Sequence, residues 1–149
     1  MKYLLLLFPL FFLSCSGPVE IMGNDYYGVI VKGLGKGAFV PEAGAVNEME
    51  KILKKRLPAI CMADTFEDAD TKDYIQEEFK NYARRYSGRT NEAGDQFILT
   101  EFFDASLKVS EKSLEDPNWS IDGGGPRYWS IEYDPAKKEF SRFYVNAPI

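Results

Sequence analysis

Alternation of apolar and polar side chains over residues 128–134 constrains the fold more than any other feature of the chain. One side of this run carries Trp129, Ile131 and Tyr133, and the other carries Tyr128, Ser130 and Glu132. A period of two residues is typical of a β-strand with one buried face. Asp134-Pro135 then predicts a turn, because Pro presets φ and Asp accepts hydrogen bonds from the backbone just beyond it.

The run after this turn completes a predicted β-hairpin. Regular alternation sets Ser141, Phe143 and Val145 against Phe140, Arg142 and Tyr144. We therefore expect one face of this strand to be apolar, and the other to combine aromatic rings with a cation. The glycine-rich segment Asp122–Pro126 before the hairpin is interpreted as a tight bend between two strands, where glycine permits positive φ.

Length and composition predict a single globular domain. The chain has 149 residues, 45% of them hydrophobic and 28% charged, which suits one core. Aromatic residues make up 15%, which favours a sheet packed on a few helices over a Leu-rich bundle. The net charge of −5 disfavours binding to nucleic acid, because the phosphate backbone requires a basic face.

The chain contains no histidine, and this excludes several kinds of catalytic and metal site. The absence of histidine excludes Ser-His-Asp catalysis, Cys-His catalysis and His-ligated zinc sites. The carboxylates of residues 64–73 lack the spacing of a calcium-binding EF-hand, so we expect no metal and no cofactor. Carboxylate-pair chemistry of the glycosidase type is still available. Its candidates are Glu101, Asp104, Asp122, Glu132 and Asp134.

The first residues of the chain predict export. Lys2 precedes an apolar run that is shorter than the about 20 residues a membrane-spanning helix needs, but that fits a secretory signal peptide. Ser14 places a small residue directly before Cys15. This arrangement resembles the lipobox of bacterial lipoproteins, although Phe12 and Leu13 depart from its usual pattern. The alternatives are an ordinary secretory signal with an incidental cysteine and a buried N-terminal helix.

The lipobox resemblance implies a division of the chain. Residues 1–14 would be the lipoprotein signal peptide, and residues 15–24 would comprise a Cys15 that carries acyl chains such as palmitate, followed by a tether. Residues 25–149 would form a single α+β domain. Ser16 resembles the type sorted to the outer membrane, which predicts a periplasm-facing lipid anchor. Cys61, the remaining thiol, lies among apolar residues and is expected to be buried.

Two amphipathic helices are predicted between residues 41 and 88. The first begins at Pro41, ends at Pro58 and has a 3.6-residue apolar period. The second has Asp70 or Thr71 as its N-cap and ends at Gly88. This interpretation places Arg84 and Arg85 in the last helical turn, where cations complement the helix dipole.

Strands are also predicted over residues 26–32 and 96–103. The latter is apolar on both faces, which is typical of a central strand beneath helices. Residues 105–118 are polar and are expected to form a surface loop with at most one helical turn. The predicted fold class is α+β, with two helices packed on an antiparallel meander of four or five strands, cystatin-like or NTF2-like in outline.

Six residues are candidates for a ligand-binding or partner-binding face. Arg84, Arg85 and Arg89 concentrate guanidinium groups, which suit carboxylate or phosphate, although complementarity to the helix dipole and surface pairing with the acidic excess of the chain are the favoured explanation. Tyr128, Arg142 and Tyr144 belong to the aromatic side of the C-terminal hairpin. Arg and Tyr are enriched at the energetic centres of protein interfaces.

The order of motifs resembles a group of small, uncharacterised Gram-negative lipoproteins. The shared features are a helix that begins at Pro, a Tyr-x-Arg-x-Tyr-x-Gly pattern at residues 82–88, Asp-Gly-Gly at residues 122–124, the hairpin Asp134 and Val-Asn at residues 145–146. Arg85 and Ala147 depart from the group's usual Gln and Gly. The resemblance spans about Phe39 to Ala147 and implies lipoprotein status and an α+β fold, but no site residues.

Together these features predict an envelope lipoprotein that is anchored in the outer membrane and acts as a binding module without catalysis. The expected partners are the membrane, through the acyl chains, and an envelope protein or a glycan. One alternative is an inhibitor or immunity-type lipoprotein whose acidic surface blocks a basic envelope-acting enzyme such as a lysozyme. The other is a glycan hydrolase with a carboxylate pair.

Overall fold

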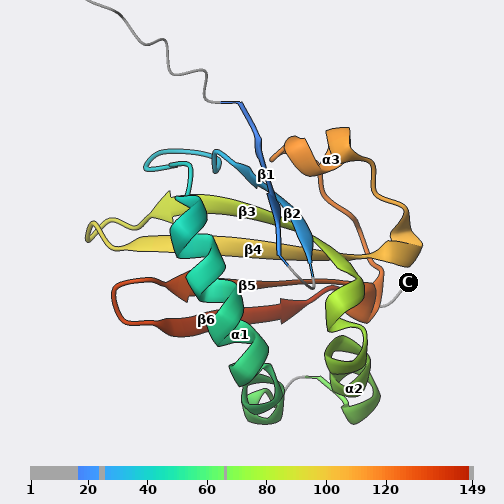
Figure 1. Ribbon diagram of the computed structural model, residues 1–149. Coiled ribbons are helices and arrows are strands. Elements are labelled where there is room, and N and C mark those ends of the chain that lie inside the picture. Colours follow the sequence, from blue (N-terminus) through green and yellow to red (C-terminus); the bar gives the residue numbers. More distant parts are fainter. Residues whose placement is uncertain (1–16, 24–25, 66, 148–149) are drawn as a thin grey trace, which may run out of the picture.

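The computed structural model describes residues 17–23, 26–65 and 67–147 (Figure 1). Its α-helices are α1 (Ala43–Ala63), α2 (Ala69–Glu77) and α3 (Glu111–Glu115), and its 3₁₀ helices are η1 (Phe79–Asn81), η2 (Ala105–Leu107) and η3 (Gly125–Arg127). Its strands are β1 (Val19–Met22), β2 (Tyr27–Val31), β3 (Tyr82–Thr90), β4 (Gln96–Asp104), β5 (Tyr128–Asp134) and β6 (Glu139–Val145).

These strands form one six-stranded sheet in the order β1-β2-β3-β4-β5-β6. Neighbouring strands are antiparallel, except that β2 and β3 are parallel. The parallel pair follows from its connection, because a crossover through helices returns the chain to the end of the sheet where it started. That crossover contains α1 and α2, and both helices lie over one face of the sheet (Figure 1).

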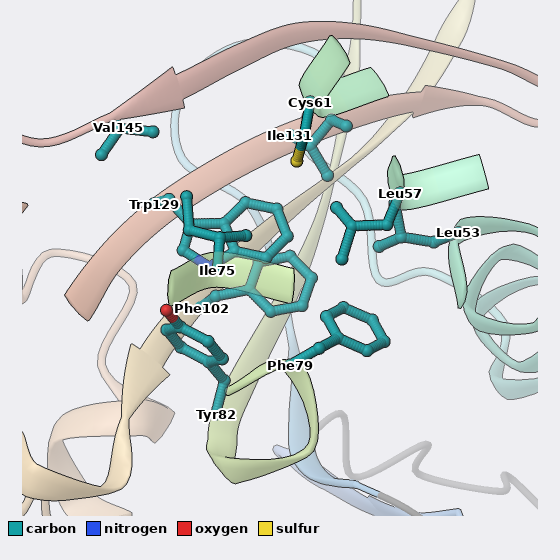
Figure 2. Close-up of a cluster of buried hydrophobic side chains, with 10 residues drawn as sticks. All are labelled: Leu53, Leu57, Cys61, Ile75, Phe79, Tyr82, Phe102, Trp129, Ile131 and Val145. Carbon is teal, nitrogen blue, oxygen red and sulfur yellow. The ribbon is translucent and has the colours of Figure 1, made fainter. Parts of the chain in front are cut away.

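The face beneath α1 and α2 holds the main hydrophobic core (Figure 2). Leu53, Leu57 and Cys61 of α1 pack in one cluster with Phe102 of β4 and Trp129 of β5. The Phe102 and Trp129 rings stack with their centroids 3.7 Å apart. Truncating a buried aromatic ring to alanine costs about 3–5 kcal/mol, so the high aromatic content holds the helices to the sheet.

The opposite face has a smaller core that covers only part of it. Leu114 of α3 packs against Val29, Val31 and Phe103, and Trp119 lies against the same cluster. The contacts of α3 with the sheet fall on β2 and β3. Among the described residues, Leu114 and Trp119 pack over Val29, Val31 and Phe103 on this face, whereas Arg142 and Tyr144 of β6 are exposed.

The α+β class and the packing of two helices on one sheet are confirmed. Trp129, Ile131 and Tyr133 are buried as predicted, and β4 lies centrally between β3 and β5. The sheet has six strands rather than four or five. One extra strand comes from Val19–Met22, a segment predicted to be tether, which pairs with β2 as β1.

The other extra strand replaces half of the predicted second helix. That helix ends at Glu77, the short η1 follows, and the run from Tyr82 to Gly88, predicted to be the last part of the helix, belongs to β3. Alternation along β3 places Arg84 on the helix-covered face and Arg85 on the opposite face, where each is buried. A helix would have placed both side chains on neighbouring parts of a single surface. The strand is therefore favoured over a helix, because it lets Arg84 and Arg85 each be buried on a different face of the sheet.

The ends of the helices also differ from the prediction. α1 does not end at Pro58 but runs through it to Ala63. Proline removes one hydrogen bond from a helix interior, and here the burial of Leu57 and Cys61 on either side of it holds the last turns against the sheet. Asp68 is the N-cap of α2 in place of Asp70 or Thr71, and its side chain accepts a hydrogen bond from the Thr71 N–H at 2.7 Å.

A β-bulge in β6 changes which side chains face the core. Arg142 has φ of +52°, and the pairing of β5 with β6 shifts between Ser130 and Glu132. Regular alternation would place Phe140 and Val145 on opposite faces, but the extra residue brings both to the helix-covered side, where Phe140 packs against Tyr133. The predicted grouping of Phe140 with Arg142 and Tyr144 is therefore wrong.

The glycine-rich segment Asp122–Pro126 leads from α3 into β5, so it does not join two strands as predicted. Positive φ occurs at Gly123, Gly124 and Gly125, in agreement with the predicted tight bend. The Asn146 amide closes the bend by donating to the carbonyl oxygens of Ile121 at 2.8 Å and Gly123 at 2.5 Å. The bend therefore serves to fasten the C-terminal end of β6.

Candidate functional site

The six predicted site residues divide between the two faces of the sheet. Arg84 lies beneath the helices, whereas Arg85 and Arg89 point to the opposite face together with Tyr128 and Tyr144. The three arginines therefore do not form the single cluster that a helix end would have produced. Only the arginines on the second face lie on the same surface as the hairpin tyrosines.

Arg85 is a structural residue of the covered half of this second face. Its side chain is 2% exposed, and its Nε and Nη2 donate to the two carboxylate oxygens of Glu101 at 2.7 and 2.8 Å. The same guanidinium donates to the carbonyl oxygens of Asp116 at 2.6 Å and Trp119 at 2.8 Å. Arg85 thus fastens the segment after α3 onto the sheet, and its donors are occupied within the protein.

Tyr128 belongs to the same buried network. Its hydroxyl donates to Oε1 of Glu101 at 2.7 Å, and its ring stacks on Phe103. Burial, followed by the nearby negative charge of Glu101, raises the pKa of Tyr128 well above its usual range. This half-buried tyrosine therefore remains a neutral hydrogen-bond donor and forms the border between the covered and uncovered halves of the face.

The uncovered half is centred on a carboxylate shared by two arginines. Arg89 donates to both oxygens of Glu132, with Nε–Oε1 at 2.7 Å and Nη2–Oε2 at 2.5 Å, and this pairing raises the pKa of Arg89. Arg142 approaches Oε2 of the same carboxylate at 3.5 Å. The Glu132 side chain is 7% exposed, whereas that of Arg142 is 70% exposed. Arg142 is therefore the cation that this group presents to its surroundings.

Apolar side chains surround this charged group. Phe97 lies under the Arg89 guanidinium, whose carbon is 4.9 Å from the ring centroid. Leu99 stands opposite Glu132 across the strands, and Tyr144, which is 58% exposed, stands opposite Ser130. We call this surface the open sheet patch. Its members are Arg89, Phe97, Leu99, Ser130, Glu132, Arg142 and Tyr144.

Sequence reasoning identified Arg89, Arg142 and Tyr144 of this patch but missed Phe97 and Leu99. Both lie on the strand correctly predicted to be apolar on both faces, and both are only half-buried. The signal that would have found them is the strand alternation of residues 82–90, which puts Arg89 directly opposite Phe97. Assignment of that run to a helix hid this pairing.

The remaining predicted arginine, Arg84, is buried on the helix-covered face. Its Nε donates to Oε1 of Glu50 at 3.1 Å, and the Tyr86 hydroxyl donates to the same oxygen at 2.8 Å. Burial raises the pKa of the Glu50 carboxyl, while the positive charge of Arg84 opposes that rise. Arg84 therefore takes no part in the open sheet patch.

The candidate carboxylates for glycan hydrolysis have structural partners. Glu101 is held by Arg85 and Tyr128, and Glu132 is held by the two arginines of the open sheet patch. Asp104 accepts from the Tyr74 hydroxyl at 2.9 Å and from the Ser106 N–H at 2.7 Å. These contacts give each of the three carboxylates hydrogen-bond partners within the protein.

The other two candidate carboxylates lie at bends of the chain. Asp134 accepts hydrogen bonds from the N–H groups of Ala136 and Lys137, as predicted for the hairpin turn. The hydrogen bond from the Lys137 ammonium, followed by these backbone bonds, lowers the pKa of Asp134. Asp122 is exposed on the glycine-rich bend. Asp134 is therefore part of the turn itself.

Within residues 17–23, 26–65 and 67–147, no group of three or more acidic or Cys side chains is arranged to hold a metal ion. Cys61 is fully buried as predicted, and burial raises the pKa of its thiol to about 11. The predicted lipidation site, Cys15, lies outside the described residues. None of the helices in the described part of the chain combines the length and apolar character needed to cross a bilayer.

Comparison of this chain with known protein families, with curated proteins and with solved structures found no match.

Proposed function

We propose that this protein is a lipid-anchored protein of the cell envelope and that its open sheet patch binds another envelope protein. The anchor would be Cys15, acylated after removal of residues 1–14, as the lipobox-like start and the resemblance to small Gram-negative lipoproteins suggest. Acyl chains contribute about 0.8 kcal/mol per buried CH₂ group, so two or more of them would hold the domain at the membrane.

The observation that carries the binding proposal is the unequal covering of the second sheet face. α3 and the segment after it shield β2 and the adjacent part of β3, whereas Arg142 and Tyr144 project from the other half at 70% and 58% exposure. Half-buried Phe97 and Leu99 lie beside them. An apolar floor with Arg and Tyr at the surface has the composition of an interface hot spot.

Charge indicates what kind of partner surface this patch suits. Two arginines share the single carboxylate of Glu132, so the patch is locally positive in a chain whose net charge is −5. The 3.5 Å separation of Arg142 from Glu132 and the high exposure of Arg142 leave its guanidinium able to bind a second carboxylate. We infer a partner that places an acidic side chain beside an apolar or aromatic patch.

Site-specific photocrosslinking in cells tests the binding surface. A photoreactive phenylalanine analogue in place of Tyr144 should yield a discrete crosslinked product, because that ring lies at the surface of the patch. The matched control is the same analogue at Met62, which is 83% exposed on the last turn of α1 over the other face. Absence of a product at Tyr144, or an identical product at Met62, would contradict the proposal.

A charge reversal sharpens this test. Arg142→Glu places a negative charge where an acidic partner residue is expected and should abolish the Tyr144 crosslink. Lys112→Glu reverses an exposed charge on α3, outside the patch, and should leave the crosslink intact. Loss of the crosslink in both variants would show that overall charge, and not the patch, determines binding.

The lipid anchor is tested separately. Cys15→Ala removes the sulfur that acylation requires, and the chain should then stay uncleaved or leave the membrane fraction and incorporate no labelled palmitate. Wild-type distribution, mass and labelling of this variant would contradict the anchor without affecting the binding proposal.

A further inference from the structure

A groove lies on the helix-covered side of the molecule, remote from the open sheet patch. It runs between α1 and the segment formed by α2 and η1, and Gly23 and Tyr26 of the β1–β2 connection close one end. Its volume is about 550 Å³. This volume falls within the about 300–1,000 Å³ that is usual for small-molecule sites.

The floor of the groove is the buried pair of Arg84 and Glu50. The Arg84 guanidinium carbon is 4.7 Å from the Phe79 ring centroid and 5.1 Å from that of Tyr26. Its Nη1 donates to the carbonyl of Tyr82 at 2.5 Å and its Nη2 to that of Phe79 at 2.9 Å.

The rim of the groove is positively charged. Lys51 and Lys54 line it from α1, and Lys80 lines it from η1, opposed by the carboxylate of Glu77. With the floor included, the lining has four cations and two carboxylates, although the whole chain carries a net charge of −5. A locally positive concavity in an acidic protein favours an anionic ligand.

The walls of the groove are apolar. Leu57 and Pro58 contribute from α1, and the rings of Phe79 and Tyr26 face them. The ring of Pro58 adds hydrocarbon to this wall. The Tyr26 ring is held in place by its hydroxyl, which donates to the Asn47 side chain at 2.7 Å.

From this arrangement we infer that the groove binds a small organic carboxylate with an apolar body. The carboxylate lies at the lysine rim, above the positive charge of the buried Arg84, and the body packs between the α1 wall and the rings of Phe79 and Tyr26. An inorganic anion leaves the apolar walls unused, and a neutral apolar molecule makes no use of the charges of Lys51 and Lys80.

Calorimetric titration of the full chain in lipid nanodiscs tests this inference, with empty nanodiscs as the blank. The probe is 4-phenylbutyrate, and the comparison ligands are the uncharged 4-phenylbutanol and inorganic phosphate. We expect saturable binding of one 4-phenylbutyrate per chain, and about tenfold weaker binding or none for the two comparison ligands. No saturable binding of the carboxylate, or equal affinity for the alcohol, would overturn the inference.

A matched pair of variants locates the site. Lys51→Glu combined with Lys80→Glu reverses the rim charge and should weaken 4-phenylbutyrate binding by about tenfold or more, since two attractive contacts become repulsive. Lys55→Glu reverses an exposed charge of α1 that does not line the groove, and should leave the affinity within about twofold. Equal weakening by both variants would show that binding responds to general charge and would refute a site in the groove.

Discussion

Arg84 and Arg85 are neighbours on β3, yet they are buried in opposite faces of the sheet in different ways. Arg84 is enclosed beneath α1 with Glu50, Tyr86 and aromatic rings. Arg85 is covered by the α3 segment, and it binds main-chain carbonyl oxygens of that segment in addition to Glu101. The first arginine is thus a charge inside a packed core, and the second is a fastener for an irregular segment.

This difference shows how the covering of each face is held. The helix-covered face is closed by large apolar clusters, in which one ion pair is embedded. The second face has only a small apolar cluster, so hydrogen bonds from Arg85 complete the attachment of its cover. The open sheet patch begins where the segment held by Arg85 ends.

Removal of Arg84 should have the largest effect on stability. Arg84→Met leaves the Glu50 carboxylate buried without its cation, and loss of one partner of a buried pair costs about 3–5 kcal/mol. Urea-induced unfolding monitored by tryptophan fluorescence would measure this cost. The double variant Glu50→Leu with Arg84→Met removes both charges and should recover most of the stability. Equal losses in the single and double variants would mean that packing, and not charge, is what Arg84 supplies.

Removal of Arg85 should cost less and act locally. Arg85→Met loses hydrogen bonds to three carbonyl groups and leaves Glu101, 12% exposed, to partial hydration, so we expect a loss of about 2–3 kcal/mol. Amide exchange over residues 111–119 should accelerate while α1 keeps its protection. Lys112→Met, on the exposed side of α3, is the control and should change neither quantity. Uniform acceleration throughout the domain would refute the fastening role.

The bulge in β6 offers a third test, because it decides which face receives Phe140. Arg142 adopts φ of +52°, a conformation that β-branched residues resist, so Arg142→Val should lower the free energy of unfolding by about 1–2 kcal/mol. Arg142→Gly accepts positive φ readily and should remain within about 0.5 kcal/mol of wild type. Thermal unfolding distinguishes these variants, and the reverse order would show that strand pairing does not depend on the bulge.

The pH dependence of stability should separate Glu50 from carboxylates at the surface. Burial raises the folded-state pKa of Glu50 above its ordinary value of 4.5, so the folded protein holds this proton more tightly than the unfolded chain. The associated stability is complete below pH 4.5 and is lost as pH rises through the folded pKa. Unfolding midpoints measured from pH 4 to pH 7 should show this decline, and Glu50→Gln should lack it.

Asp134 should show the opposite pH dependence of stability. Hydrogen bonds and the ammonium of Lys137 lower its folded-state pKa below 3.8, so its contribution is present above that value and is lost as pH falls through the folded pKa. Asp134→Asn should therefore flatten only the acidic end of the profile. A Glu50→Gln profile that changed at the same end would contradict the assignment of the raised pKa to Glu50.

Much of the fold was predictable because its signals are local. The apolar stripe of α1, the strand period of residues 128–134 and the Asp134-Pro135 turn each depend on residues close together in the chain, and each is confirmed. The run from Tyr82 to Gly88 was not predictable in this way, because its tyrosines and arginines fit a helix end as well as a strand. Pairing with β2 and β4 decides between the two.

The candidate site was predicted in part for the same reason. Arg142 and Tyr144 belong to a hairpin whose existence is a local property, and both are exposed. Phe97 lies in the same patch only because of the register of β3 with β4. Arg84 lies on the other face only because β3 is a strand. The groove between α1 and η1 has no sequence signature, because its lining comes from four separate segments.

The sequence by itself determined the α+β composition, the amphipathic helices, the hairpin and the exclusion of histidine chemistry, since these follow from local periodicity and residue content. Tertiary structure alone decided the faces on which the arginines lie, the carboxylates they bind and the half of the sheet that stays uncovered. The physical reason is that strand pairing and the burial of charge join residues far apart in the chain. Their free energies depend on partners that no short stretch of sequence contains.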